Sequence, residues 1–212
     1  MIAAIDYGKA RCGVAIGERI PSKVFTVPPE KIKEELSKYN LEAIVVGLPL
    51  SMSGRYSLQT FEVVGFAERL QKELNKKVYM IDERLTSELF KGKENVDELV
   101  AVQLFQEFTS SKITLYQIKP AKKLPEDILE TIKIFQGKIL LAEISDVNAA
   151  GNNTTIFQTD PYYAYLFHKA GFFVERSWKE LEKLSPFDMI VVEGDCNKFK
   201  TFLSKGGKLV CL

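Results

Sequence analysis

The sequence has 212 residues, of which 46% are hydrophobic and 27% are charged, as is typical of a folded globular protein. The formal net charge is +1, so no global basic field indicates a nucleic-acid partner, although a local cluster of Lys and Arg would suffice to bind one. The single histidine, His168, excludes a Ser-His-Asp triad and histidine-rich zinc sites. Catalysis would therefore rest on carboxylates, lysines or a bound metal.

Two further classes of protein are excluded by simple features of the chain. No apolar stretch reaches transmembrane length and no signal peptide is visible, so we expect a cytoplasmic protein without a membrane partner. The three cysteines, Cys12, Cys196 and Cys211, are far apart and form no paired motif, which predicts no disulfide and a reducing compartment. We expect Cys12 and Cys211 in the core and Cys196 as a bystander thiol in a turn.

The chain opens with an apolar run at residues 2–5, which is long enough for one buried strand, and Asp6 follows it directly. Residues 7–9 predict a tight turn and residues 13–16 a returning strand. A carboxylate at the end of a buried strand is costly unless a cation or hydrogen-bond donors meet it. Asp6 therefore either binds a metal or caps a turn.

The next hundred residues predict alternating strands and helices. Carboxylates recur in this part just past the end of a strand or at the start of the last helix, at Asp6, Asp82, Glu83 and Asp97. Because ligands of α/β sheets bind at the carboxyl ends of the strands, these acids are candidates for one site. The expected strands cover residues 21–27, 43–49 and 78–81, and the expected helices cover residues 30–39, 59–74 and 97–108.

From residue 112 the pattern becomes a repeated strand-helix alternation. It predicts a second domain over residues 113–212, a small doubly wound parallel α/β domain of unknown function, after a first domain over residues 1–112. The Asn-rich segment 146–155 lacks the glycines of a dinucleotide-binding loop and is interpreted as a polar loop. The expected strands are 113–118, 138–144, 172–175, 189–193 and 209–212, and the expected helices are 126–135, 160–169, 177–184 and 197–203.

Carboxylates that converge without histidine favour hard cations, so the expected cofactor is Mg²⁺ or Mn²⁺. Two such ions can hold a scissile phosphodiester, one activating the attacking water and the other stabilising the leaving oxygen.

Four blocks of the sequence, in this order and spacing, resemble the YqgF family, whose members are RNase H-like proteins provisionally described as pre-16S rRNA nucleases and related to Holliday junction resolvases. The resemblance covers residues 1 to about 110. It implies an RNase H-like mixed sheet whose first three strands are antiparallel, and metal-dependent hydrolysis of phosphodiester bonds. The blocks are Asp6-Tyr-Gly-Lys-Ala-Arg-Cys-Gly-Val-Ala-Ile-Gly17, Ile44-Val-Val-Gly-Leu-Pro-Leu-Ser-Met-Ser-Gly54, Asp82-Glu-Arg-Leu-Thr-Ser87 and Val96-Asp97.

Carried over by position, the resemblance implies that Asp6, Glu83 and Asp97 are the catalytic and metal-binding acids. Asp82 ranks second, because its side chain should point to the other face of the strand. The family often has Asp where this chain has Ser53 and Glu18, and these departures concern the choice of substrate more than metal binding.

Four cations are candidates for contacts with the phosphate backbone of a substrate. Lys9 and Arg11 flank the first turn, Arg55 follows the glycine loop, and Arg84 follows Glu83. For each of them a solvated surface position or a salt bridge is the alternative interpretation.

The favoured function is a metal-dependent nuclease that matures the 5′ end of pre-16S rRNA. A Holliday junction resolvase acting on four-way DNA is the alternative within the same chemistry, and it would need a dimer with two matching sites. A non-catalytic RNA-binding protein is the alternative outside it. The sequence leaves the oligomeric state open.

Overall fold

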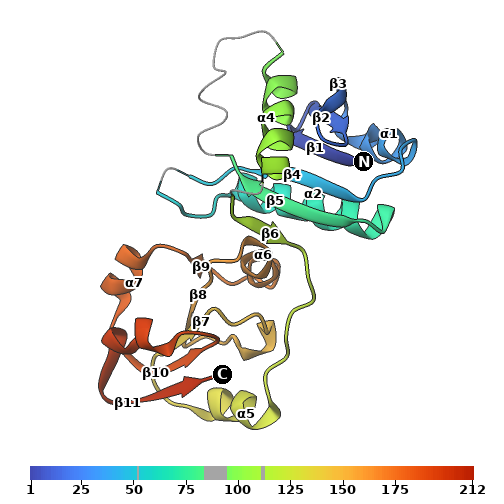
Figure 1. The fold of residues 1–212 in the computed structure, drawn as a ribbon. Coiled ribbons are helices and arrows are strands. Elements are labelled where there is room, and N and C mark those ends of the chain that lie inside the picture. Colours follow the sequence, from blue (N-terminus) through green and yellow to red (C-terminus); the bar gives the residue numbers. More distant parts are fainter. Residues whose placement is uncertain (52, 84–94, 111–112) are drawn as a thin grey trace. The chain divides into compact units, whose positions relative to one another are not determined.

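The computed structural model describes residues 1–51, 53–83, 95–110 and 113–212. Its contacts divide the chain into two compact units. The first consists of Met1–Met52 and Ser57–Ile118, and the second of Ser53–Tyr56 and Lys119–Leu212. Figure 1 shows the two units, and each is described by itself below.

The first unit is built on a six-stranded mixed sheet with the order β3-β2-β1-β4-β5-β6. The first three strands are antiparallel to one another in sequence order, β4 and β5 run parallel to β1, and β6 is antiparallel to β5. This arrangement confirms the predicted RNase H-like mixed sheet. The strands are β1 Ile2–Tyr7, β2 Cys12–Gly17, β3 Pro21–Val27, β4 Ala43–Leu48, β5 Lys77–Asp82 and β6 Leu115–Gln117.

Helices α1 (Ile32–Ser37), α2 (Leu58–Leu74) and α4 (Val96–Ser110) accompany this sheet. The hydroxyl of Ser57 accepts a hydrogen bond from the Thr60 amide, which caps α2 where the sequence predicts a helix start. One core cluster joins four strand residues to α4, and it contains Ala4, Ala15, Val45, Ile81, Val100, Ala101, Leu104 and Phe105. The Tyr7 and Phe66 rings, 4.4 Å apart, connect β1 to α2. Because side chains alternate along a strand, Ala4 and Tyr7 lie on opposite faces, so α4 and α2 cover different faces of the sheet.

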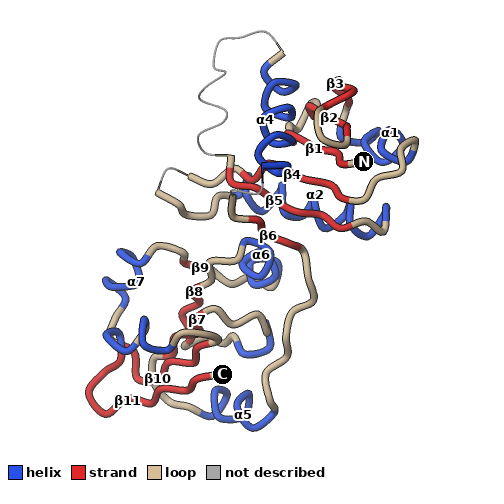
Figure 2. The backbone as a smooth tube through the Cα atoms, in the orientation of Figure 1, coloured by secondary structure: helices blue, strands red, loops and turns tan. Residues whose placement is uncertain are grey.

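The second unit is a five-stranded sheet with the order β11-β10-β7-β8-β9, in which every pairing is parallel. The chain runs outward from β7 to β9 and then returns to the other side of β7, which confirms the predicted doubly wound parallel domain (Figure 2). The strands are β7 Ile139–Ala142, β8 Thr154–Phe157, β9 Val174–Glu175, β10 Phe187–Val192 and β11 Leu203–Cys211, and the helices are α5 Glu126–Ile134, α6 Pro161–Lys169 and α7 Trp178–Leu184.

The structure differs from the sequence-based expectations at three elements. Strand β8 begins within the segment expected to be a loop. The start of that segment is rich in Asn, but a short run with β-branched residues, which favour strands, follows it. The expected helix 197–203 consists of two 3-10 turns, Cys196–Lys198 and Lys200–Phe202, before β11 begins. The strand expected at 113–118 is β6, and it pairs with β5 of the first sheet.

The prediction that the chain has no disulfide is wrong, because Cys196 and Cys211 are joined. The two residues are 15 positions apart in the sequence, but β10 and β11 are parallel neighbours, so the turn after β10 lies beside the end of β11. Cys211 is exposed and not in the core, whereas Cys12 is free and buried as expected. Among the described helices none has the length and hydrophobicity needed to cross a membrane.

Candidate active site

Asp6 lies near the end of β1, directly after three fully buried residues. It shares a face of the sheet with Ala4, so its side chain lies on the side that α4 covers. Burial raises the pKa of Asp6 to about 6, and the nearby charge of Asp97 adds to this effect. Asp6 is therefore a partly desolvated carboxyl group with another acid close by.

Glu83 follows β5 and is held by a backbone hydrogen bond of 3.2 Å from its amide to the Leu48 carbonyl. Its carboxylate lies over Gly47 of β4, where an added Cβ would be only 2.2 Å from Glu83 Oε2. Burial, then Asp6, then Asp82 raise the pKa of Glu83 to about 8. The Oε2 atom is buried and has no hydrogen-bond partner within the described part of the chain. A buried carboxylate oxygen without a donor is a position that a cation would stabilise.

Asp97 is the second residue of α4, and its backbone carbonyl lies over Gly13 of β2. Gly13 is the strand partner of Asp6, so the start of α4 is fixed beside the end of β1. An added Cβ at Gly13 would be 1.9 Å from the Asp97 oxygen, which shows how closely the helix approaches the sheet. The Asp97 side chain forms an ion pair with Arg11 from the turn after β1.

Asp6 thus interacts electrostatically with both other acids. Glu83 follows β5, on the other side of β4, and Asp97 belongs to the start of α4, which lies over β2. In the described ranges no three His, Cys, Asp or Glu side chains are already arranged to hold a metal ion, and the Asp97 carboxylate is engaged by Arg11. Asp82, ranked second, precedes Glu83 on the strand, and alternation directs it to the opposite face from Ile81 and Glu83.

The structure places the candidate cations in different surroundings. Lys9 forms an ion pair of 2.9 Å with Glu62 of α2, and Arg11 pairs with Asp97. Arg55 belongs to the second unit, where it pairs at 2.9 Å with Glu175, a side chain only 2% exposed. Arg84 lies outside the described residues. Of the three that the structure describes, Arg11 is the one paired with a candidate catalytic acid.

Neither Gly13 nor Gly47 was identified from the sequence as part of this site. Both glycines lie where a neighbouring functional residue approaches a strand too closely for any Cβ. Glycine inside a strand often marks such a close approach, and this signal was present in the sequence.

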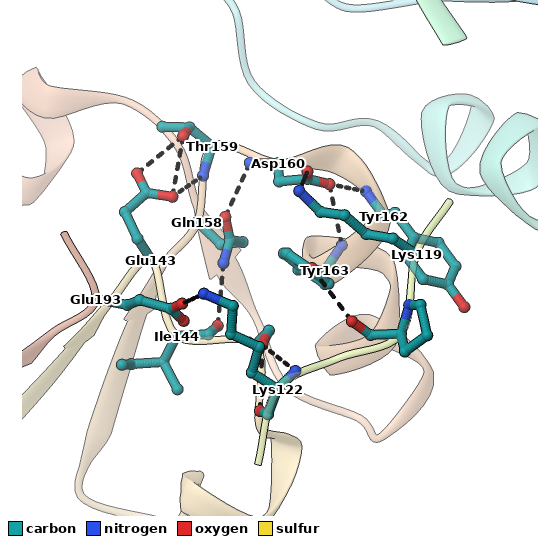
Figure 3. Close-up of polar contacts among 12 residues, drawn as sticks. Lys119, Lys122, Glu143, Ile144, Gln158, Thr159, Asp160, Tyr162, Tyr163 and Glu193 are labelled. Atoms are coloured by element: carbon teal, nitrogen blue, oxygen red, sulfur yellow. Dashed lines mark hydrogen bonds and ion pairs between the residues drawn. The ribbon is translucent and has the colours of Figure 1, made fainter. Parts of the chain in front are cut away.

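A second group of polar side chains lies at the carboxyl ends of β7, β8 and β10 in the second unit (Figure 3). Glu143 accepts hydrogen bonds from the Thr159 amide and hydroxyl, the Gln158 side chain bridges Ile144 and Asp160, and Lys122 pairs with Glu193. These donors, acceptors and charges are paired with one another, so the network explains how the loops at this edge of the sheet are held in place. It does not indicate a cofactor.

The chain is similar in sequence to several known proteins. Residues 1–111 match the model of the RuvX family, which is described as Holliday junction resolvase. A Thermotoga maritima protein provisionally named as a pre-16S rRNA nuclease is 34% identical over 215 residues, which cover 100% of this chain and 94% of that protein. The match therefore includes the second unit.

Other relatives with the same provisional name match a shorter stretch of the chain. An Alcanivorax borkumensis protein is 40% identical over 95 residues, or 40% of this chain and 71% of that protein. A Rickettsia bellii protein is 35% identical over 94 residues, or 40% of this chain and 61% of that protein. The solved structure of T. thermophilus RuvC with a Holliday junction substrate aligns with a TM-score of 0.37 and 14% identity, over 55% of this chain and 98% of that one. The family model and the full-length relative show that the chain belongs to the RuvX family.

Proposed function

We propose that this chain is a divalent-metal-dependent nuclease that hydrolyses phosphodiester bonds in a precursor of 16S rRNA. The activity lies in the first unit, and the second unit is an accessory domain. The observation that carries the proposal is the buried Oε2 of Glu83, which has no hydrogen-bond partner among the residues that the structure describes and lies close to Asp6 at the end of β1. The names of the relatives supply the substrate class.

The residues present fit a hard cation, because Asp6, Glu83 and Asp97 offer only oxygen ligands. Glu83 is positioned by the space over Gly47, and the start of α4 is positioned by the space over Gly13. These three acids would hold the metal, with Asp97 leaving its ion pair with Arg11. When bound, Mg²⁺ or Mn²⁺ would supply a lowered pKa for the attacking water and charge stabilisation for the leaving oxygen.

The side chains have further roles in this proposal. Glu83, whose pKa is raised to about 8, would have to give up its proton to hold the metal, whereas Asp6, with a pKa of about 6, has largely lost its proton at neutral pH. Arg11, once separated from Asp97, contacts a phosphate oxygen of the substrate. Lys9 is the second candidate phosphate contact at the same turn. Arg84 and Arg55 also remain candidates for contacts with the phosphates of the substrate.

The decisive experiment compares the wild type with Asp6→Asn on end-labelled precursor RNA, with Mg²⁺ or Mn²⁺ and with chelator. We expect cleavage that needs metal and falls at least a hundredfold in the variant, together with weaker Mn²⁺ binding by calorimetry. Equal cleavage by both proteins would refute the proposal. RNA binding by the wild type without any cleavage would instead support the non-catalytic alternative.

A Holliday junction resolvase is the second candidate, because this is the description of the matching family. The same assay with a labelled four-way DNA junction tests it. Resolution needs paired cuts from two symmetric sites, so the chain would have to be a dimer in solution. A monomeric protein that cuts precursor RNA and leaves the junction intact would eliminate this candidate.

A further inference from the structure

The last part of the second unit carries an uncompensated positive charge. From Cys196 to Leu212 there are four lysines and no acidic residue. Lys198, Lys200, Lys205 and Lys208 are all exposed, and none has an ion-pair partner in the ranges that the structure describes. A local cluster of this kind attracts anions even though the whole chain is nearly neutral.

The only tryptophan of the sequence lies against the same segment. Trp178 is 40% exposed, and its ring lies 5.0 Å from Phe199 and 6.0 Å from Phe202, nearly parallel to Phe202 at 26°. A third ring, Phe157, lies 4.7 Å away. The three phenylalanines are buried, so they form a fixed support under a partly exposed indole.

The lysines nearest in sequence to this support are Lys198 and Lys200, which flank Phe199. Lys179 follows Trp178 and is also exposed. Two acids lie close to these residues in the sequence: Glu180 pairs with Lys183 at 2.8 Å, and Asp195 caps the following 3-10 turn by accepting a hydrogen bond from the Asn197 amide. We call Trp178, Lys179, Lys198 and Lys200 the tryptophan-lysine patch.

Protection of a sheet edge is another reason for exposed lysines, because charge on an edge strand prevents pairing with a second chain. This explanation suits Lys205 and Lys208, which lie in β11 at the edge of the sheet. It does not apply to Lys198 and Lys200, which lie in the 3-10 turns before that strand. Nor does it account for an exposed indole.

We infer that the tryptophan-lysine patch binds single-stranded nucleic acid, with Trp178 stacking on a base and the lysines contacting the adjacent phosphates. The combination of an exposed aromatic ring on a fixed support with neighbouring cations is the chemistry by which proteins bind single strands without sequence preference. The choice of nucleic acid as the partner rests on the proposed nuclease function. The patch would give the accessory domain the task of holding an unpaired part of the substrate.

Because Trp178 is the sole tryptophan, its fluorescence reports directly on this patch. The full chain is titrated in chelator with a short uridine-rich RNA, the matching DNA, an RNA duplex and polyglutamate. We expect quenching by either single strand, at least tenfold weaker binding of the duplex, and no quenching by polyglutamate. Equal quenching by polyglutamate would show an acidic-peptide site and overturn the inference, as would single-strand binding that leaves the fluorescence unchanged.

Charge-reversal variants test the lysines with a matched control. In K198E/K200E the affinity for a fluorescently labelled single strand, measured by anisotropy, should fall at least tenfold, and the slope of log affinity against log salt should decrease by about 1.4, which is ~0.7 for each phosphate that a lysine no longer neutralises. The control K123E/K133E makes the same charge change at two exposed lysines of the same unit, and it should bind nearly as the wild type does. An equal loss of affinity in both variants would show that the lysines act only by non-specific electrostatic attraction, and it would refute the inference that the patch is a binding site.

The stacking role has its own variants, Trp178→Ala and Trp178→Phe. The alanine variant should bind about tenfold more weakly, whereas phenylalanine should recover most of the affinity because it restores a ring on the same support. A melting curve for each variant separates a defect in stacking from a defect in folding. If Trp178→Phe is folded and binds as weakly as Trp178→Ala, the ring does not stack on a base.

These measurements use no metal, so they are independent of cleavage. Asp6→Asn should show the same quenching of Trp178 as the wild type, even if it cannot cut RNA. If the wild type proves not to be a nuclease and still shows the expected quenching, the proposed function fails and the patch stands. If the wild type cuts RNA but the single strand does not quench Trp178, the proposed function stands and the inference about the patch fails.

Discussion

The carboxylate of Glu83 occupies the space over Gly47, where a Cβ would lie 2.2 Å from Glu83 Oε2 and 2.9 Å from Leu104 Cδ1. In Gly47→Ala the carboxylate of Glu83 must leave its position over Gly47 and the Leu104 side chain must shift slightly, while the backbone can stay in place. We therefore expect cleavage to fall at least tenfold while the free energy of unfolding drops by only about 1–2 kcal/mol. Initial rates on labelled RNA and a denaturant titration measure the two effects.

The control for this variant is Gly151→Ala in the second unit. Gly151 has only one atom within reach of an added Cβ, Asn153 Oδ1 at 3.7 Å, so the substitution should change neither cleavage nor stability. A Gly47→Ala protein that cuts RNA at the wild-type rate would show that the position of Glu83 over Gly47 does not matter for the reaction.

Gly13→Ala should behave differently from Gly47→Ala, because the added Cβ would meet a backbone atom. The Asp97 carbonyl, 1.9 Å from that position, can move only if the start of α4 moves. We expect a loss of stability of about 1–3 kcal/mol or more, together with a loss of cleavage. Denaturant titration checks the first and the RNA assay the second. A Gly13→Ala protein as stable as the wild type would contradict the close packing of α4 on β2.

The ion pair between Arg11 and Asp97 predicts a competition between an internal cation and a metal. Both side chains are partly exposed, at 63% and 27%, so Arg11→Gln should change stability by less than about 1 kcal/mol. The same substitution frees Asp97, so we expect Mn²⁺ to bind about threefold or more tightly by calorimetry, a change within the range of one such ion pair. RNA binding should weaken, because glutamine has no charge with which to attract a phosphate oxygen.

Lys9→Gln is the matched control for Arg11→Gln, since it removes the same charge from the same turn. Lys9 pairs with Glu62 of α2 and not with a candidate ligand, so the affinity for Mn²⁺ should remain at the wild-type value. An equal gain in both variants would mean that Arg11 acts through general charge and not through its contact with Asp97.

The strand-end acids could be predicted from the sequence because their placement follows from local rules. An apolar run ending at Asp6 or just before Glu83 puts the carboxylate at the edge of a sheet, and alternation decides which face it occupies. The order of the blocks then gave the fold of the first unit. The parallel, doubly wound second unit followed from the alternation of strands and helices in the same way.

What the sequence did not reveal depends on which distant segments become neighbours. The disulfide requires that β10 and β11 be adjacent and parallel, and the ion pair of Arg11 joins residues 86 positions apart. The partial exposure of the Trp178 ring depends on the tertiary structure in the same way, because it is set by which rings pack beneath the indole. Strand β8 was missed because turn-forming residues precede it directly.

The raised pKa values of the site predict how the stability of the metal-free protein depends on pH. Glu83 has a pKa of about 8 in the folded chain against an ordinary value of 4.5. Between these values the unfolded chain has released a proton that the folded chain keeps, so the free energy of unfolding falls as the pH rises through this range. The stabilisation is complete below pH 4.5 and is lost above about pH 8.

Glu83→Gln removes this titration, so in chelator the variant should exceed the wild type in stability at pH 9 by on the order of 5 kcal/mol, the value of a pKa shift from 4.5 to about 8, and the advantage should vanish near pH 4. Asp6→Asn should show the same behaviour in a lower window, from 3.8 to about 6, and should gain nothing further above pH 7. Glu34→Gln, a substitution of an exposed acid in α1, is the control with an unchanged profile. Denaturant titrations followed by circular dichroism at pH 4, 7 and 9 separate these cases. A wild type whose stability rises between pH 5 and 8, with Glu83→Gln following it in parallel, would show that Glu83 is already ionised and paired in the folded chain, and that no buried acid awaits a cation at the end of β1.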